Sequence, residues 1–199
     1  MYAKIETYTE YKKGKKMIVT LSGITGTGKS FFKDAISNEL NIKNLTIITT
    51  RSKRKNEVDG IDKEFVDDEK FEQLKAEGEI AVDFEFLGSK YAYRKQYFQS
   101  QDNYVTEVHY DTIYEFKKNA SEVFSVYIIP YDIERAKLEL KKRELPEPVE
   151  KDRLKEIEEH IKEYSTNKEL QEQFDYVLVN DYTEESKEKL FEIIKQQIK

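Results

Sequence analysis

The hydrophobic positions of this chain form short apolar runs that alternate with stretches of helical spacing. Residues 17–21 are a continuous run rich in β-branched side chains, which is typical of a strand buried on both faces of a parallel sheet. From Phe31 to Leu40 the apolar residues recur on one helical stripe, and Asn41 allows the helix to stop. Residues 45–48 predict a second strand, so the core begins with a β-α-β unit.

The pattern changes in the middle of the chain. Residues 80–87 partly alternate between apolar and polar and end at Gly88 and Ser89, which predicts a hairpin turn. We therefore interpret residues 51–98 as a small mixed insertion. Residues 1–15, which are polar and rich in lysine, are interpreted as an extension or a short edge strand.

After the insertion, strand-like and helical stretches alternate again. Such alternation predicts a mainly parallel sheet flanked by helices, which is the α/β class. Strands are expected at 104–109, 123–129 and 176–179. A helix is expected at 132–143, and because Pro146 and Pro148 break it, a second helix follows them and runs to about residue 164. A last helix is expected around Leu190, Phe191, Ile194 and Ile198.

Composition narrows the functional classes. Of the 199 residues 37% are charged, and 40 acidic residues outnumber 34 basic ones, so the net charge is -6. This balance argues against nucleic acid as a partner, because phosphate backbones favour a basic face. No run approaches the roughly 18 apolar residues of a membrane span and the N-terminus lacks an apolar signal core, so a cytoplasmic protein without a membrane partner is expected. Because cysteine is absent, disulfides, thiolate zinc sites and cysteine nucleophiles are excluded.

The strongest chemical signal is GITGTGKS at residues 23–30, which matches the phosphate-binding loop G-x-x-x-x-G-K-[ST]. Gly23, Gly26 and Gly28 allow the backbone to approach a phosphate closely and to turn its amides inward. The string lies between a predicted strand and a predicted helix, as the mechanism requires, and this context argues against a chance match. The motif predicts a nucleoside triphosphate site.

Two side chains of the loop carry the charge and the metal chemistry. Lys29 is predicted to place its ammonium group against the β- and γ-phosphates, and Ser30 to offer its hydroxyl to Mg²⁺. The N-terminus of the following helix adds partial positive charge. A nucleoside triphosphate with Mg²⁺ is therefore the expected ligand. The predicted donor-binding residues are Gly23, Gly26, Thr27, Gly28, Lys29, Ser30 and Phe31.

A second anion site is predicted at TTRSKR, residues 49–54. Arg51 and Arg54 follow the end of a predicted parallel strand, where ligands gather in open α/β sheets, and two guanidinium groups can bind a phosphate in bidentate fashion. The alternative is a solvated charged surface, because most charge runs have no other role.

The order of these motifs resembles that of guanylate kinases. The matching strings are GITGTGKS, TTRSKR, Gly88-Ser89-Lys90-Tyr91 and Val179-Asn180-Asp181, and the resemblance covers residues from about 16 to 199. It implies a P-loop NTPase fold with a kinase core at 16–50 and 99–199, an acceptor-binding insertion at 51–98 and a helical lid at about 141–160. It also implies transfer of the γ-phosphate of ATP to GMP.

The resemblance implies roles for side chains outside the loop. Arg51, Arg54 and Tyr91 would bind the acceptor phosphate. Arg51 and the lid arginines Arg143 and Arg153 would take part in catalysis. Asn180 would lie near adenine, and Glu107 would bind Mg²⁺ through water. Lid closure would bring cations to the phosphoryl group while it excludes water. The alternative for the lid arginines is ordinary helix salt bridging, and for Glu107 a salt-bridged surface position.

The groups that read guanine in this family are mostly absent here. Val82 stands near a family Glu, with Asp83 as a one-residue substitute, and His109 stands near a family Asp. Positions where the family has hydroxyl groups hold Ile47, Lys63 and Tyr93. Because a hydrogen-bonding pocket rejects analogues that leave its polar groups unpaired, these changes predict a changed acceptor base. Asp83 and His109 are the candidate acceptor-binding residues that replace the family groups.

Two features keep both a structural and a functional interpretation. His109 is either a packed strand residue or a hydrogen-bonding group for a base or a sugar. The aromatic residues between 84 and 98 form either the small core of the insertion or a stacking surface for a base. His160 is expected on the surface of a charged helix. His109 and His160 lack the further ligands that a zinc site needs.

Three functions are in view. The leading one is an ATP- and Mg²⁺-dependent nucleoside monophosphate kinase of guanylate kinase type, with GMP, dGMP or another nucleotide, including a modified one, as acceptor. The second is a non-catalytic module that binds protein through the acceptor cleft, although such a module has no chemical need for Lys29 and Ser30. The third is a kinase for a phosphorylated sugar, which needs Arg51 and Arg54 but no base pocket. A homodimer is left open.

Overall fold

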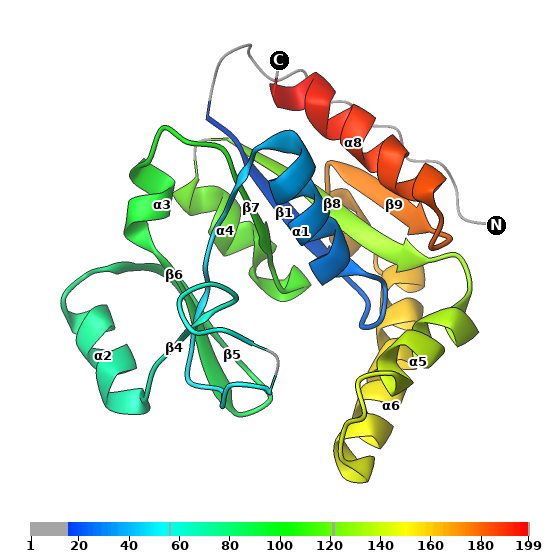
Figure 1. The fold of residues 1–199 in the computed structure, drawn as a ribbon, viewed down its shortest axis with the longest axis horizontal. Coiled ribbons are helices and arrows are strands. Elements are labelled where there is room, and N and C mark those ends of the chain that lie inside the picture. Colours follow the sequence, from blue (N-terminus) through cyan, green and yellow to red (C-terminus); the bar gives the residue numbers. More distant parts are fainter. Residues whose placement is uncertain (1–15, 56, 121, 199) are drawn as a thin grey trace.

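The structure, a computed structural model, describes residues 16–55, 57–120 and 122–198. A five-stranded sheet forms the centre, and a four-stranded sheet lies to one side of it (Figure 1). The predicted extension at 1–15 lies outside the described residues. Within the described part of the chain, no helix is both long enough and apolar enough to span a bilayer.

The central sheet has the order β2-β7-β1-β8-β9, and all of its strand pairs are parallel. Its strands are β1 (Ile18–Gly23), β2 (Lys43–Asn44), β7 (Tyr104–Glu107), β8 (Val123–Pro130) and β9 (Tyr176–Asn180). Every residue of β8 is buried, and so are all residues of β1 except the last. This burial on both faces explains the continuous apolar runs, and the predicted mainly parallel sheet is confirmed.

Each face of the central sheet has its own apolar layer. Val19 and Leu21 pack with α1 (Lys29–Leu40) and α8 (Glu184–Ile198) on one face. Ile18 and Tyr127 belong to the layer on the other face, which is built with the remaining core helices. These helices are α4 (Ile113–Asn119), which follows the 3-10 turn η1 (Tyr110–Thr112), and then α5 (Ile133–Lys141), α6 (Glu147–Thr166) and α7 (Lys168–Glu172).

The second sheet has the order β4-β3-β6-β5 and carries its own small core. Its strands are β3 (Ile48–Thr49), β4 (Glu64–Phe65), β5 (Ile80–Phe86) and β6 (Ser89–Arg94), and its helices are α2 (Asp68–Ala76) and α3 (Lys95–Gln99). The predicted hairpin is confirmed, because β5 and β6 pair antiparallel around Leu87 and Gly88, which both have positive φ. The exact boundaries of the insertion and the lid stay predictions.

The single strand predicted at 45–48 is wrong. The chain leaves β2 after Asn44 and enters β3 only at Ile48, and it crosses from one sheet to the other in between. The Leu45 amide still donates to the Val105 carbonyl of the central sheet, whereas the Ile47 carbonyl accepts from Glu64 of the second sheet. An apolar run cannot tell one buried strand from a buried crossing between two sheets, because both bury the same side chains.

Helices α5 and α6 form a hairpin that extends beyond the edge of the central sheet (Figure 1). Lys137 of α5 pairs with Glu158 of α6 at 2.8 Å. The sequence predicts that Pro146 and Pro148 both lie between the two helices. Pro146 does so, as the N-cap of α6, but Pro148 lies inside the first turn of α6. A proline is tolerated in that turn because its missing N–H has no helical partner there anyway.

Candidate active site

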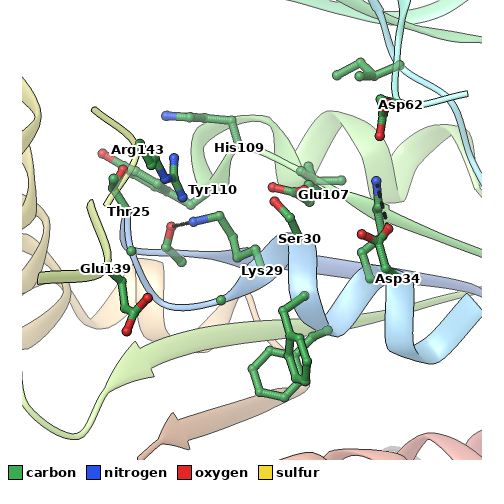
Figure 2. Close-up of a pocket in the computed structure, with 18 of the residues that line it drawn as sticks. Thr25, Lys29, Ser30, Asp34, Asp62, Glu107, His109, Tyr110, Glu139 and Arg143 are labelled. Atoms are coloured by element: carbon green, nitrogen blue, oxygen red, sulfur yellow. Dashed lines mark hydrogen bonds and ion pairs between the residues drawn. The ribbon is translucent and has the colours of Figure 1, made fainter. Parts of the chain in front are cut away.

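A cavity of about 770 Å³ opens where β1 and β7 end, between the 23–30 loop, the second sheet and the α5–α6 hairpin. Its lining includes Lys29, Arg51, Arg54, Arg143 and Arg153. The structure thus brings the two predicted anion sites and both candidate lid arginines to one space. Figure 2 shows the side of the cavity next to the phosphate loop, with Lys29, Arg143 and His109.

Two glycines make the turn of the loop possible. Gly23 has φ 132°, and a Cβ there would lie 2.1 Å from the Ile128 carbonyl oxygen of β8. Gly26 has φ 85°, and a Cβ there would lie 2.3 Å from the Ala136 carbonyl oxygen of α5. Because both obstacles are backbone atoms, neither can yield easily, and the loop backbone is held against β8 and the lid hairpin.

Lys29, at the first turn of α1, reaches back over the loop. Its Nζ donates hydrogen bonds to the carbonyls of Gly23 at 2.9 Å and Ile24 at 2.8 Å, and Figure 2 draws one of these bonds. Burial lowers the pKa of Lys29 to about 8, while Glu107 acts in the opposite direction. At neutral pH the ammonium group therefore stays mostly protonated and places positive charge in the cavity.

Ser30 and Glu107 form a pair of oxygen donors beside Lys29 (Figure 2). Burial by itself raises the pKa of Glu107, but Lys63, Lys29, Lys33 and a hydrogen bond from Ser30 together hold it below the usual range. The carboxylate is thus ionised. An ionised carboxylate next to a hydroxyl suits Mg²⁺, which takes few protein ligands and completes its shell with water and phosphate oxygens.

Asn180 and Tyr182 hold the loop from the end of β9. The Asn180 amide donates to the Thr27 carbonyl at 3.0 Å, and its oxygen accepts from the Tyr182 N–H at 2.8 Å. The Tyr182 hydroxyl donates to the Gly26 carbonyl at 3.1 Å. Asn180 also lines the cavity, so a position near adenine stays a prediction, but its amide is already committed to the loop. Sequence reasoning missed Tyr182, because nothing local marks a residue whose partner is so distant.

Phe31 and Thr27 differ in their access to the cavity. Phe31 lines it and is 60% exposed, with its ring edge-to-face against Phe32. Thr27 is fully buried, and its hydroxyl donates to the Ile24 carbonyl at 2.7 Å. The side chain of Thr27 therefore shapes the loop, and only its backbone can face a nucleotide.

Arg51 and Arg54 lie across the cavity from the loop. Arg51 pairs with Glu57 at 2.6 Å, and its guanidinium lies over the Phe65 ring. The second Glu57 oxygen accepts from the backbone N–H of Arg54 at 2.8 Å. Burial and the neighbouring Arg51 lower the pKa of Arg54, and Arg143 and Arg153 add to this effect. The four guanidinium groups are thus close enough to influence one another electrostatically.

The two candidate lid arginines have different surroundings. Arg153 pairs with Glu156, one turn along α6, at 2.6 Å, and its guanidinium lies 5.2 Å from the centre of the Phe86 ring. For Arg153, helix salt bridging and a place in the cavity wall are thus both observed. Arg143 follows α5, and within the described residues its guanidinium has no ion-pair partner. Arg143 is therefore the more available cation of the two.

Asp83 does not reach the cavity, so its predicted role in acceptor binding is wrong. It lies on the exposed face of β5 and pairs with Lys75 of α2 at 2.5 Å. Successive strand side chains point to opposite faces, so Phe84 lines the cavity while Asp83 faces away from it. Val82 is buried and offers no polar group.

Tyr91 and His109 do line the cavity, and so do several residues whose role the sequence did not show. Tyr91 stacks on Phe84 with ring centres 5.2 Å apart. Burial and His160 lower the pKa of His109 to about 4, so its imidazole is uncharged at neutral pH. The surface position expected for His160 is wrong, because its side chain is 14% exposed and its ring lies against Tyr110 in the cavity wall. Other such lining residues are Lys33, Glu57, Lys63, Tyr110, Glu156 and Tyr182.

Fold and cavity together define a class of protein. A phosphate loop at the end of a parallel sheet faces a cluster of guanidinium groups, and a helical hairpin overhangs both. This arrangement is that of a P-loop kinase whose acceptor also carries a phosphate. Among the described residues, no group of three or more histidine or carboxylate side chains could hold a metal alone, so Ser30 and Glu107 are the candidate oxygen donors.

Comparison with known proteins narrows the class. Residues 14–197 match the family model described as guanylate kinase. The guanylate kinase of Malacoplasma penetrans is 30% identical over 195 residues, which cover 94% of this chain and 95% of that protein. The guanylate kinase of Bacillus subtilis is 28% identical, over 92% of this chain and 89% of that protein. The crystal structure of guanylate kinase from Anaplasma phagocytophilum matches with a TM-score of 0.67 and 27% identity, over 94% of this chain and 88% of that one.

The chain belongs to the guanylate kinase family. It is therefore a phosphotransferase of the nucleoside monophosphate kinase type. Neither the non-catalytic module nor the sugar phosphate kinase is favoured by these matches.

Proposed function

We propose that this chain transfers the γ-phosphate of Mg²⁺-ATP to a nucleoside monophosphate, with GMP as the first expected acceptor. One observation carries the proposal. Lys29 of the phosphate loop and the arginine pair Arg51 and Arg54 line the same cavity, so two phosphate groups bound to them would face each other. All the close relatives described above are named guanylate kinases.

The donor triphosphate is held mainly by backbone. Loop amides and the N-terminus of α1 supply partial positive charge, and Lys29 supplies a full charge at the β- and γ-phosphates. When a triphosphate enters, the Lys29 ammonium exchanges its bonds to the Gly23 and Ile24 carbonyls for phosphate oxygens. Asn180 and Tyr182 keep the loop in its binding shape from behind.

The acceptor phosphate is held by guanidinium groups. Glu57 fixes Arg51 by an ion pair and the Arg54 backbone by a hydrogen bond, so the two arginines are arranged before the acceptor binds. Arg143 and Arg153 approach the cavity from the lid and stabilise charge that builds up on the transferred phosphoryl group. The lid also excludes the water that would otherwise hydrolyse ATP.

The metal position fits the residues present. Ser30 and Glu107 would hold Mg²⁺, directly or through water, and the bound ion would neutralise phosphate charge and orient the donor. The cationic neighbours Lys29, Lys33 and Lys63 keep Glu107 ionised and ready for this role. Cytoplasmic location, independence from nucleic acid and a homodimer stay predictions.

A coupled ADP-release assay tests the proposal. Purified full chain, ATP and MgCl₂ are combined with GMP, dGMP, IMP, AMP, CMP and UMP in turn. We expect a rate far above the ATP-only background with at least one purine nucleotide, and loss of that rate when Mg²⁺ is chelated. A background rate with every acceptor would refute the proposal, and a response to ribose 5-phosphate alone would favour the sugar phosphate kinase.

A further inference from the structure

A belt of aromatic rings crosses the cavity from the second sheet to helix α6. Its members are Tyr91, Phe84, Phe86, His109, Tyr110 and His160, and all of them line the cavity. Phe84 and Tyr91 stack within 13° of parallel. The His109 ring lies 4.6 Å from the centre of Phe86 and 4.7 Å from the centre of Tyr110. Such faces bind a nucleobase by stacking, and stacking is tolerant of base identity.

The carboxylates that line the cavity all have a hydrogen-bond or ion-pair partner. Glu156 accepts from Arg153 through one oxygen, and its other oxygen lies 3.4 Å from the Thr25 hydroxyl. Glu57 uses one oxygen for Arg51 and the other for the Arg54 backbone. The remaining carboxylates of the lining are also paired: Asp34 with Lys33, Asp62 with the Val58 N–H, Glu107 with Ser30, Glu139 with Arg135 and Lys142, and Glu184 with Lys187.

Two rings of the belt carry a buried nitrogen without a hydrogen-bond partner among the described residues, His109 at Nε2 and His160 at Nδ1. The His160 nitrogen lies 3.8 Å from Glu156, whereas in His109 it is the other nitrogen, Nδ1, that lies 3.5 Å from a carboxylate, Asp111. His109 Nε2 is therefore the ring nitrogen that the belt leaves for a ligand. A buried polar atom without a partner is uncommon, because its lost hydration is not replaced. A ligand that inserts between the rings and carries a hydrogen-bonding edge would supply that partner.

The chemistry of base edges then limits what this site can read. Guanine presents two adjacent donors, N1–H and the 2-amino group, and reading both requires an acceptor pair such as a free carboxylate. Hypoxanthine presents N1–H but no 2-amino group. An imidazole offers one nitrogen to the base, which can donate or accept according to its tautomer, so it cannot require the second donor.

We propose that the aromatic belt and His109 bind the acceptor base by stacking and a single hydrogen bond, so that the kinase accepts purine nucleoside monophosphates with or without a 2-amino group. This inference rests on the proposed function and specifies its acceptor class. It also explains why Asp83 can face away from the cavity, since the site reads the base without a free carboxylate.

The decisive measurement is kcat/KM for GMP against IMP, which differ only in the 2-amino group. We expect a ratio below about 200, the range that shape alone gives, whereas a site built to hydrogen-bond the group discriminates by about 10⁴. Calorimetric titration of the two nucleotides into the full chain should give dissociation constants that differ by less than the same factor. A ratio above about 200 in either measurement would overturn the inference.

Two substitutions at one position sharpen the test. His109→Asp introduces a free acceptor pair, and we expect it to raise the GMP-to-IMP ratio at least about tenfold, because the 2-amino group gains a partner. His109→Gln offers an adaptable amide, and the ratio should stay within about threefold. Glu85→Gln, on the exposed face of β5, is the matched control. An unchanged ratio in His109→Asp would overturn the assignment of His109.

The ratio is insensitive to folding defects, because both acceptors are assayed on one preparation and the amount of folded enzyme cancels. Failure of the proposed function and failure of this inference give different results. No ADP release with any nucleotide would refute the proposed function and this inference with it. Release with GMP together with strong rejection of IMP would refute the inference alone.

Discussion

The donor and acceptor halves of the cavity are built in different ways. The donor half is one strand-loop-helix connection, residues 23–30, made mainly of backbone atoms with Lys29 folded over them. The acceptor half gathers side chains from separate segments, and pairs such as Arg51 with Glu57 hold it in place. The part of it around His109, where we propose that the base binds, is lined by rings.

This difference has a physical consequence for how each half can change. Loop amides and close glycine contacts tolerate few substitutions, because a side chain at Gly23 or Gly26 meets backbone. Side chains on strands and helices can be exchanged singly while the fold is kept. The same family fold can therefore keep its donor chemistry while its acceptor surface alters.

Removing the Lys29 charge should have the largest effect. In Lys29→Ala we expect kcat/KM for ATP to fall about 10³-fold, since loss of one preorganised charge at the reacting group costs about 10²- to 10³-fold or more. KM for the acceptor should change little, because the arginine pair is intact. Lys118→Ala, on the surface of α4, is the control. A variant that kept a tenth of the wild-type kcat/KM would show that the two halves do not divide the work in this way.

A glycine substitution in the donor half should cost more stability than one in the acceptor half. Gly26→Ala combines a positive φ with a backbone obstacle at 2.3 Å, so we expect about 3 kcal/mol lost from the free energy of unfolding. Gly88→Ala, in the β5–β6 turn, has φ 69° but no atom within 4 Å of the new Cβ, so we expect about 1 kcal/mol. Urea denaturation measures both, and equal losses would contradict the difference in construction.

Breaking the Glu57 pair should give a modest effect that depends on pH. Burial alone would raise the pKa of Glu57, but hydrogen bonds from Arg51 and the Arg54 backbone hold it below 4.5. A lowered folded-state pKa stabilises the protein above the unfolded value of 4.5, and this contribution is lost as the pH falls through the folded pKa.

We therefore expect Glu57→Gln to lose about 1–2 kcal/mol at pH 7, because a charged hydrogen-bonded pair becomes a neutral one. The difference from wild type should shrink as the pH falls from about 5 toward 3. Urea denaturation at a series of pH values measures it. A difference that did not vary with pH would mean that the Glu57 charge is not what stabilises the acceptor half.

Much of the fold could be predicted from local pattern. Strands β1, β8 and β9 and helices α1 and α8 were expected within a few residues, because buried runs and helical stripes are periodic signals. The prediction of a single strand at 45–48 was wrong, because the division of this segment between two sheets depends on pairing with the later strands β7 and β4. No local signal holds that information.

The residues of the site likewise differ in how far local sequence predicts them. One contiguous string predicts Lys29 and its loop. The prediction for Asp83 rests only on its nearness in sequence to Val82, and Asp83 faces away from the cavity on β5, paired with Lys75. The charged helix around His160 predicts a surface position, but the His160 ring packs against Tyr110 in the cavity wall. Tyr182 gave no signal at all, because its partner Gly26 belongs to a segment far away in the chain.

The phosphate loop, the parallel core and the family could all be recognised from the amino-acid sequence alone. Each depends on residues that are close along the chain or on a motif order that survives divergence. Which side chains line the far end of the cavity, around His109, could be seen only in the folded molecule. That outcome depends on strand faces, on the crossing between two sheets and on the docking of helix α6, and each of these is fixed by contacts between distant segments rather than by any local pattern.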